Sequence, residues 1–110
     1  MKAEEVDFLV RRLLSDILPL DGLEEAILFG SAARGEMTEA SDLDIVLIFS
    51  RPSEAAHAAR TVHQKRKASA EWPTDLLCVD RAAYTEKSAI GGVYLIARED
   101  GRRIYPVEGE

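Results

Sequence analysis

The chain has 110 residues, enough for one domain with a single hydrophobic core, and we expect residues 1–110 to form that domain. Its net charge of −6 argues against broad, non-specific nucleic-acid binding, which depends on neutralising phosphates. The single cysteine, Cys78, excludes an internal disulfide and favours a cytoplasmic location, and no apolar run reaches membrane-spanning length.

Residues 3–18 carry apolar side chains at three- and four-residue steps, which predicts a helix with one buried face. Acidic residues come before basic ones along this segment, an order that suits the helix dipole. Pro19 and the pair Asp21-Gly22 end the helix. We expect the helix to pack on a sheet, and a partner surface on its outer face stays open.

The most informative stretch begins with a predicted strand at residues 25–29 and ends with a second strand at 43–49. Gly30, which ends the first strand, can take backbone angles that other residues avoid. Ser31 can cap the following segment, whose free N–H groups favour a phosphate. A loop around a short helical turn connects this Gly-Ser turn to the second strand.

Two carboxylates, Asp42 and Asp44, stand at the start of the second strand. Alternate residues of a strand point to the same face, so these two project together and Leu43 points the other way. The apolar residues 45–49 predict a buried central strand. Neighbouring carboxylates repel each other, but they suit Mg²⁺, which takes hard oxygen ligands and leaves positions open for substrate phosphates.

An alanine-rich helix is predicted from residue 53 to about residue 70. Its last turns hold the cluster Lys65-Arg66-Lys67, for which a solvated face at the helix C-terminus is favoured over a role in guiding a nucleotide or an acidic partner. His57 and His63 lack the spacing of zinc ligands.

The third predicted strand, residues 74–79, has an aspartate near its start. Asp75 is a turn or strand-cap residue on position alone, and beside the Asp42 and Asp44 pair it becomes a candidate third metal ligand. Asp80 is the competing candidate, although its place before the next segment favours a helix cap.

Residues 81–99 are predicted to be mainly helical, with a weak point at Gly91-Gly92, and residues 102–105 form a short edge strand. The predicted fold is therefore an α/β fold with a mixed sheet of about four short strands and helices packed on it. Its predicted chain order is α-β-α-β-α-β-α-β.

Other nucleotide and hydrolase motifs are absent from the sequence. Gly30 and Gly35 have the spacing of P-loop glycines, but Glu36-Met37 stand where Lys and Ser or Thr are required. There is no G-x-G-x-x-G motif, and Ser31 is not in a G-x-S-x-G elbow. These residues therefore argue against a P-loop NTPase and give no support to a serine hydrolase.

The pair Gly30-Ser31, followed after ten residues by Asp42-Leu43-Asp44, resembles the signature of the DNA polymerase β-like nucleotidyltransferase superfamily. The fuller string GSAARGEMTEASDLDIVL is similar to its small bacterial and archaeal branch, the minimal nucleotidyltransferases. That branch is often encoded beside a HEPN-domain protein as an antitoxin and toxin pair. The resemblance covers essentially the whole chain, including the final LIAREDGRRIYP, and it implies the nucleotidyltransferase fold.

The resemblance also implies roles for individual residues. Two Mg²⁺ ions and the triphosphate are expected at three catalytic, metal-binding carboxylates, namely Asp42, Asp44 and Asp75. Gly30 and Ser31 are expected to hold the β- and γ-phosphates. Arg34 is equally a solvated charge or a phosphate ligand from its position alone, and the resemblance favours the phosphate role.

The resemblance implies that ATP is the donor and that a tyrosine of the HEPN toxin accepts AMP, which silences the toxin. A hetero-oligomer with the toxin is then expected, with no membrane and no templated nucleic acid. Two alternatives stay open: an antitoxin that neutralises its toxin by binding alone, and a nucleotidyl-transfer subunit that acts on a small molecule. No residue in the sequence distinguishes ATP from another nucleotide.

Overall fold

The computed structural model describes residues 1–107. It contains these elements in chain order: α1 (Ala3–Ile17), β1 (Leu23–Phe29), β2 (Leu43–Phe49), α2 (Pro52–Lys65), β3 (Thr74–Asp80), α3 (Arg81–Ile90), α4 (Gly92–Asp100) and β4 (Arg102–Tyr105). The mixed α/β architecture with four short strands confirms the predicted fold class.

The four strands form one sheet in the order β3-β2-β1-β4. Strand β1 pairs antiparallel with both β2 and β4, whereas β2 and β3 are parallel. The parallel pair is possible because α2 carries the chain back to the end of the sheet where β2 began. As a consequence, β2 and β3 both begin at the edge where β1 ends.

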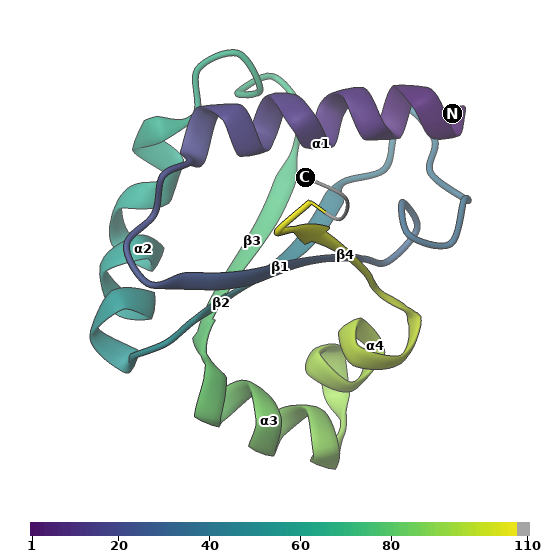
Figure 1. Ribbon diagram of the computed structural model, residues 1–110. Helices are drawn as coiled ribbons and strands as arrows, with labels where there is room; N and C mark the ends of the chain where they lie inside the picture. Colours follow the sequence, from purple (N-terminus) through teal and green to yellow (C-terminus); the bar gives the residue numbers. More distant parts are fainter. Residues whose placement is uncertain (108–110) are drawn as a thin grey trace.

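Helices α1 and α2 lie on one side of the sheet, and α3 and α4 lie on the other (Figure 1). Strand β2 is buried on both faces, as its apolar run predicts: Leu43, Ile45, Leu47 and Phe49 face α1 and α2, and Val46 and Ile48 face α3 and α4. Because side chains alternate along a strand, Asp44 lies on the α3/α4 side, next to Val46 in that row.

Helix α1 buries the face that its apolar period predicts, through Val6, Val10, Leu13, Leu14 and Ile17. Glu4 and Glu5 lie in its first turn, where their negative charges interact favourably with the positive end of the helix dipole. Among residues 1–107, the structure has no helix with the length and apolar character needed to cross a bilayer.

Three parts of the predicted chain order differ from the structure. Between β1 and β2 the chain makes turns instead of a helix, because the glycines at positions 30 and 35 take positive φ angles of 74° and 73°. Helix α2 ends at Lys65, and the rest of its predicted length forms a connecting segment. The predicted weak point at Gly91 is a break that separates α3 from α4.

The segment between α2 and β3, residues 66–73, is fixed by side chains that satisfy its backbone. The Asp16 carboxylate accepts hydrogen bonds from Lys67 N at 2.8 Å, Ser69 N at 2.7 Å and Ser69 Oγ at 2.7 Å, and these bonds lower the pKa of Asp16. Arg66 donates to the carbonyls of Ser69 and Trp72. Lys65, in the last turn of α2, donates to Pro19 O, so two members of the basic cluster also anchor the chain, while Lys67 is exposed.

Candidate active site at the edge of the sheet

The Gly-Ser turn directly follows the end of β1. Phe29, the last residue of β1, pairs with Asp44 of β2, so the turn lies beside the second of the predicted carboxylates. The amide of Arg34 donates to Gly30 O at 3.2 Å and that of Glu36 to Ser31 O at 2.9 Å, which closes a single irregular turn. The segment therefore bends without forming a helix between β1 and β2.

The carboxylates of β2 and β3 come together because the two strands are parallel and in register. Asp44 pairs with Asp75 across the two strands. Both side chains belong to the rows that face α3 and α4, since Val46 and Leu77 follow them in those rows. Asp42 is exposed and lies just before β2 begins. Asp80 lies at the opposite end of β3 and caps α3 by accepting a hydrogen bond from Ala83 N at 3.1 Å, as predicted.

The three carboxylates interact electrostatically. Burial, the negative charges of Asp75 and Asp42, and a hydrogen bond with the Asp75 carboxyl raise the pKa of Asp44 above its usual value. The positive charge of Arg34 opposes this shift. The site therefore holds negative charge that a cation would stabilise.

Gly30 leaves room for the Asp44 carboxylate. A Cβ atom at position 30 would lie 2.3 Å from Asp44 Oδ2, well inside van der Waals contact, and the φ of 74° is itself unfavourable for other residues. The glycine is thus required for two separate reasons, the bend of the chain and the position of a neighbouring carboxylate.

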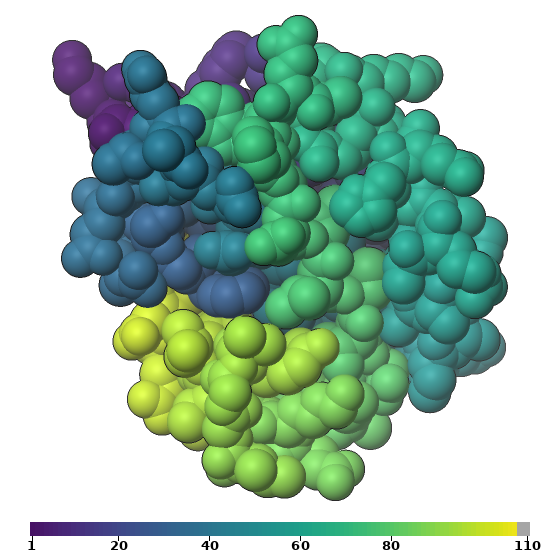
Figure 2. Space-filling view, turned by 180° about the vertical axis from the view of Figure 1, so that it is seen from behind, coloured from purple at the N-terminus to yellow at the C-terminus, as the bar shows by residue number. Residues whose placement is uncertain are grey.

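Arg34 pairs with a carboxylate of its own turn. Its Nε donates to Glu36 Oε1 at 2.7 Å, and both side chains are largely exposed. Glu36, and more weakly Asp100 and Asp44, raise the pKa of Arg34. Figure 2 shows the segment after β1 in blue beside the yellow-green end of α4. Sequence patterns do not point to Asp100, because it lies 66 positions from Arg34 and only the fold brings the two residues near each other.

The donor set at this edge fits Mg²⁺. Within residues 1–107, no group of three or more His, Cys, Asp or Glu side chains is arranged to hold a metal ion. Proteins nevertheless bind Mg²⁺ commonly through one or two carboxylates, with waters and substrate phosphates completing the coordination. Asp44 and Asp75 supply such a pair of oxygen donors, with Asp75 exposed and Asp44 partly buried beside Gly30.

The comparison with known families agrees with this geometry. Residues 9–105 match the family described as nucleotidyltransferase domain. The chain belongs to that family. The match spans the Gly-Ser turn, the three carboxylates and all four strands of this nucleotidyltransferase domain. No curated protein sequence matches the chain significantly.

Two solved structures have the same fold as this nucleotidyltransferase domain. One is a protein from Sulfolobus solfataricus described as a nucleotidyltransferase, with 21% identity and a TM-score of 0.58 over 92% of this chain and 84% of that chain. The other is a mutant of the toxin-antitoxin MntA-HpeT, with 17% identity and a TM-score of 0.51 over 98% of this chain and 76% of that chain. At these identities the likeness establishes the fold.

Cys78 in β3 takes no part in the site. Burial raises the pKa of its thiol to about 11, which keeps the thiol protonated and unreactive at neutral pH.

Proposed function

We propose that this domain is an Mg²⁺-dependent nucleotidyltransferase that transfers AMP from ATP to a tyrosine of a HEPN-domain toxin and thereby acts as its antitoxin. The observation that carries the proposal is the register of β2 and β3, which brings Asp44 beside Asp75 at the end of the Gly-Ser turn. A phosphate-binding turn beside paired carboxylates is the arrangement that nucleotide chemistry requires.

In this proposal each residue has a distinct role. Asp42 and Asp44 hold the metal ions together with the triphosphate, and Asp75 holds the ion nearer the acceptor. Gly30 and Ser31 orient the β- and γ-phosphates, and Arg34 adds positive charge. Bound Mg²⁺ would neutralise phosphate charge and favour loss of the acceptor proton.

The reaction forms one bond and breaks one. The tyrosine oxygen of the acceptor bonds to the α-phosphorus of ATP, the bond from that phosphorus to the β-phosphate oxygen breaks, and pyrophosphate leaves. The hydroxyl proton passes to solvent. Arg34 is well placed to stabilise charge on the departing phosphates, since it lies beside the turn and acts electrostatically on Asp44.

A protein acceptor is favoured because one of the structurally similar proteins belongs to a toxin-antitoxin pair. A separate argument comes from exposure: Asp42 and Asp75 are both exposed at the edge of the sheet, where a large substrate can approach them. A complex with the toxin would then be part of the reaction.

The first alternative is neutralisation by binding alone, with the carboxylates inactive. The raised pKa of Asp44 argues against it, because burial of this carboxylate and its repulsion by Asp75 and Asp42 cost stability without benefit if no cation binds. The second alternative is transfer to a small molecule, which a partner chain would have to help bind.

The decisive experiment is transfer of label from α-labelled ATP, with Mg²⁺, to the protein encoded beside this chain's gene. Wild type is compared with the double variant Asp42→Asn, Asp44→Asn, and a chelated sample serves as the metal control. Label on a tyrosine of the neighbour with wild type only would support the proposal. Silencing of the neighbour by both proteins, without label, would refute it and support binding alone.

A further inference from the structure

The chain that leads into β3 is held at the carbonyl of Trp72, two residues before the strand begins. This oxygen accepts hydrogen bonds from Arg66 Nη2 at 2.6 Å and from Thr74 Oγ1 at 3.1 Å. The carbonyl of the next residue, Pro73, accepts a hydrogen bond from Leu43 N at 3.0 Å. Two side chains and the start of β2 therefore converge on the dipeptide that precedes β3.

The same place sets the register of the candidate site. Leu43 and Thr74 are the first partners in the parallel pairing of β2 and β3, and Asp44 and Asp75 are the next. Strand β3 lies at the edge of the sheet and has β2 as its strand neighbour. Because Asp75 comes directly after Thr74, a displacement of the chain that enters β3 moves the Asp75 carboxylate with it.

Arg66, the residue that caps the C-terminus of α2, joins both ends of the turn before β3. Its Nη2 atom also donates to Ser69 O at 2.5 Å, and Trp72 N donates to the same oxygen at 3.1 Å. Arg66 Nε is buried and makes no hydrogen bond within the described residues 1–107. One donor atom of an enclosed guanidinium thus binds two carbonyls that are three residues apart.

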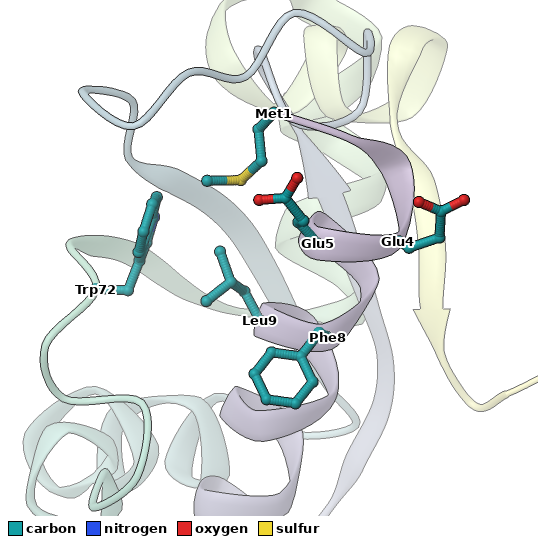
Figure 3. A pocket seen from close by; sticks show the side chains of 6 residues that line it. All are labelled: Met1, Glu4, Glu5, Phe8, Leu9 and Trp72. Atoms are coloured by element: carbon teal, nitrogen blue, oxygen red, sulfur yellow. The ribbon is translucent and has the colours of Figure 1, made fainter.

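Helix α1 contacts the turn through other groups. Asp16 accepts hydrogen bonds from Ser69 N and Ser69 Oγ, and the Trp72 ring lies beside Leu9 of α1 (Figure 3). These contacts hold Ser69 and the Trp72 side chain. Arg66 instead binds the Trp72 carbonyl, so it ties the backbone immediately before β3 to the end of α2.

We infer that Arg66 is a positioning residue for Asp75, because it holds the entry to β3 so that the Asp75 carboxylate stays beside that of Asp44. The inference rests on the proposed function, in which the two carboxylates bind a divalent cation together. Arg66 touches neither the cation nor the nucleotide in this scheme and acts through the backbone of residues 72–75. Displacement of a reacting group by about 1 Å can lower a rate about 100-fold, so a loosened entry is expected to affect the site.

Replacing Arg66 by methionine removes both donated bonds and leaves each carbonyl with another donor. Trp72 N still binds Ser69 O, and Thr74 Oγ1 still binds Trp72 O. The melting temperature is therefore expected to fall by only about 4–8 °C. Arg66→Gln, which is too short to reach both carbonyls, is a second variant that keeps a polar group in the enclosed space.

Lys65→Met is the matched control. Lys65 also donates from the end of α2 to a backbone carbonyl, but that carbonyl belongs to Pro19, in the connection between α1 and β1. The control therefore removes a comparable bond of the neighbouring residue and leaves the entry to β3 untouched.

The first measurement is the affinity for Mn²⁺ alone, from free Mn²⁺ in electron paramagnetic resonance, at a temperature where all variants are folded. Mn²⁺ takes the same oxygen ligands as Mg²⁺, and Asp44→Asn gives the binding at other carboxylates. We expect both Arg66 variants to bind Mn²⁺ about tenfold more weakly than wild type. Lys65→Met should bind it within about twofold of wild type.

The second measurement is transfer of α-labelled nucleotide to the protein encoded beside this chain's gene. The rate with either Arg66 variant should fall about tenfold. The KM for ATP should stay within about twofold, because the residues proposed to hold the triphosphate, Gly30, Ser31, Asp42 and Asp44, all come before β3. A loss of global stability alone would not separate the rate from the KM in this way.

Wild-type Mn²⁺ affinity in a folded Arg66 variant would overturn the inference, as would an equal loss in Lys65→Met or a wild type whose Mn²⁺ binding does not depend on Asp44. The proposed function fails separately. A wild type that binds Mn²⁺ at Asp44 but transfers no label would refute that function, and the Mn²⁺ affinities would still decide the role of Arg66.

Discussion

Replacing Gly30 by alanine separates the role of this glycine in the chain bend from its role at the carboxylates. The new Cβ would lie 2.3 Å from Asp44 Oδ2, whereas ordinary contacts begin near 3.4 Å, so the oxygen must move by about 1 Å. The atom it meets is the end of a side chain, which can rotate at little cost. A displacement of about 1 Å in a catalytic group can lower the rate about 100-fold.

Gly35 supplies a matched control in the same loop. Its φ of 73° nearly equals the 74° of Gly30, but a Cβ at position 35 meets nothing within 4 Å. Either alanine should cost about 1–2 kcal/mol of unfolding free energy through the left-handed backbone. For a domain of this size, that corresponds to a melting temperature lower by about 4–8 °C.

The assay pairs urea unfolding with transfer of α-labelled nucleotide for both alanine variants. Similar losses of stability with a loss of activity only in Gly30→Ala would support the predicted displacement of Asp44. Equal activity in the two variants would refute it, because the carboxylate would then tolerate a side chain at position 30.

Three further predictions concern charged residues. Asp44→Asn should lower the rate of nucleotidyl transfer by at least about two orders of magnitude. It should also raise the melting temperature at pH 7. A carboxyl whose folded pKa is raised destabilises the protein as pH rises through that pKa, and this cost is absent when the carboxyl is protonated. The higher melting temperature of Asp44→Asn relative to wild type should therefore disappear below about pH 4 in a pH series of melting curves. Arg34→Ala should raise the KM for nucleotide about tenfold, because a positive charge near the phosphates is lost. Its stability should change little, because the ion pair of Arg34 with Glu36 is exposed. Glu36→Gln should leave the KM within about twofold of wild type. Asp16 has a lowered folded pKa, so the stability that its hydrogen bonds provide is complete above its ordinary pKa of 3.8 and is lost as pH falls below that value. The difference in melting temperature between wild type and Asp16→Asn should therefore narrow below about pH 4. A difference that stays constant with pH would contradict this linkage.

Local patterns predicted most of the fold correctly. The apolar period of α1 and the apolar run of β2 gave their elements within one or two residues, because burial on one face and on both faces leaves distinct sequence patterns. The end of α2 was predicted too late. The helix was predicted to continue to about residue 70, but hydrogen bonds that the Asp16 carboxylate accepts and that Arg66 donates stabilise another conformation there.

The candidate site was predictable to the extent that its residues are close in sequence. Strand alternation predicted that Asp42 and Asp44 project together, although Asp42 lies just before β2 in the structure. On position alone Asp75 was a turn or strand-cap residue, and only the Asp42 and Asp44 pair favoured a metal role for it. Its place beside Asp44 depends on the parallel pairing of β2 and β3, a long-range feature. The contact of Arg34 with Glu36 was missed for a different reason, since both residues lie in an irregular turn that has no periodic pattern.

The pairing of Asp44 with Asp75 also restricts how the length of this chain can change in evolution. One residue inserted near the start of β3 would turn Asp75 to the opposite face, and two would restore the face but shift the carboxylate by about 6–7 Å along the strand. Insertions in the segment between Gly35 and Ser41 leave that register untouched, because the sheet does not include it. Natural length variation should therefore collect in this loop, while the beginning of β3 keeps a constant length.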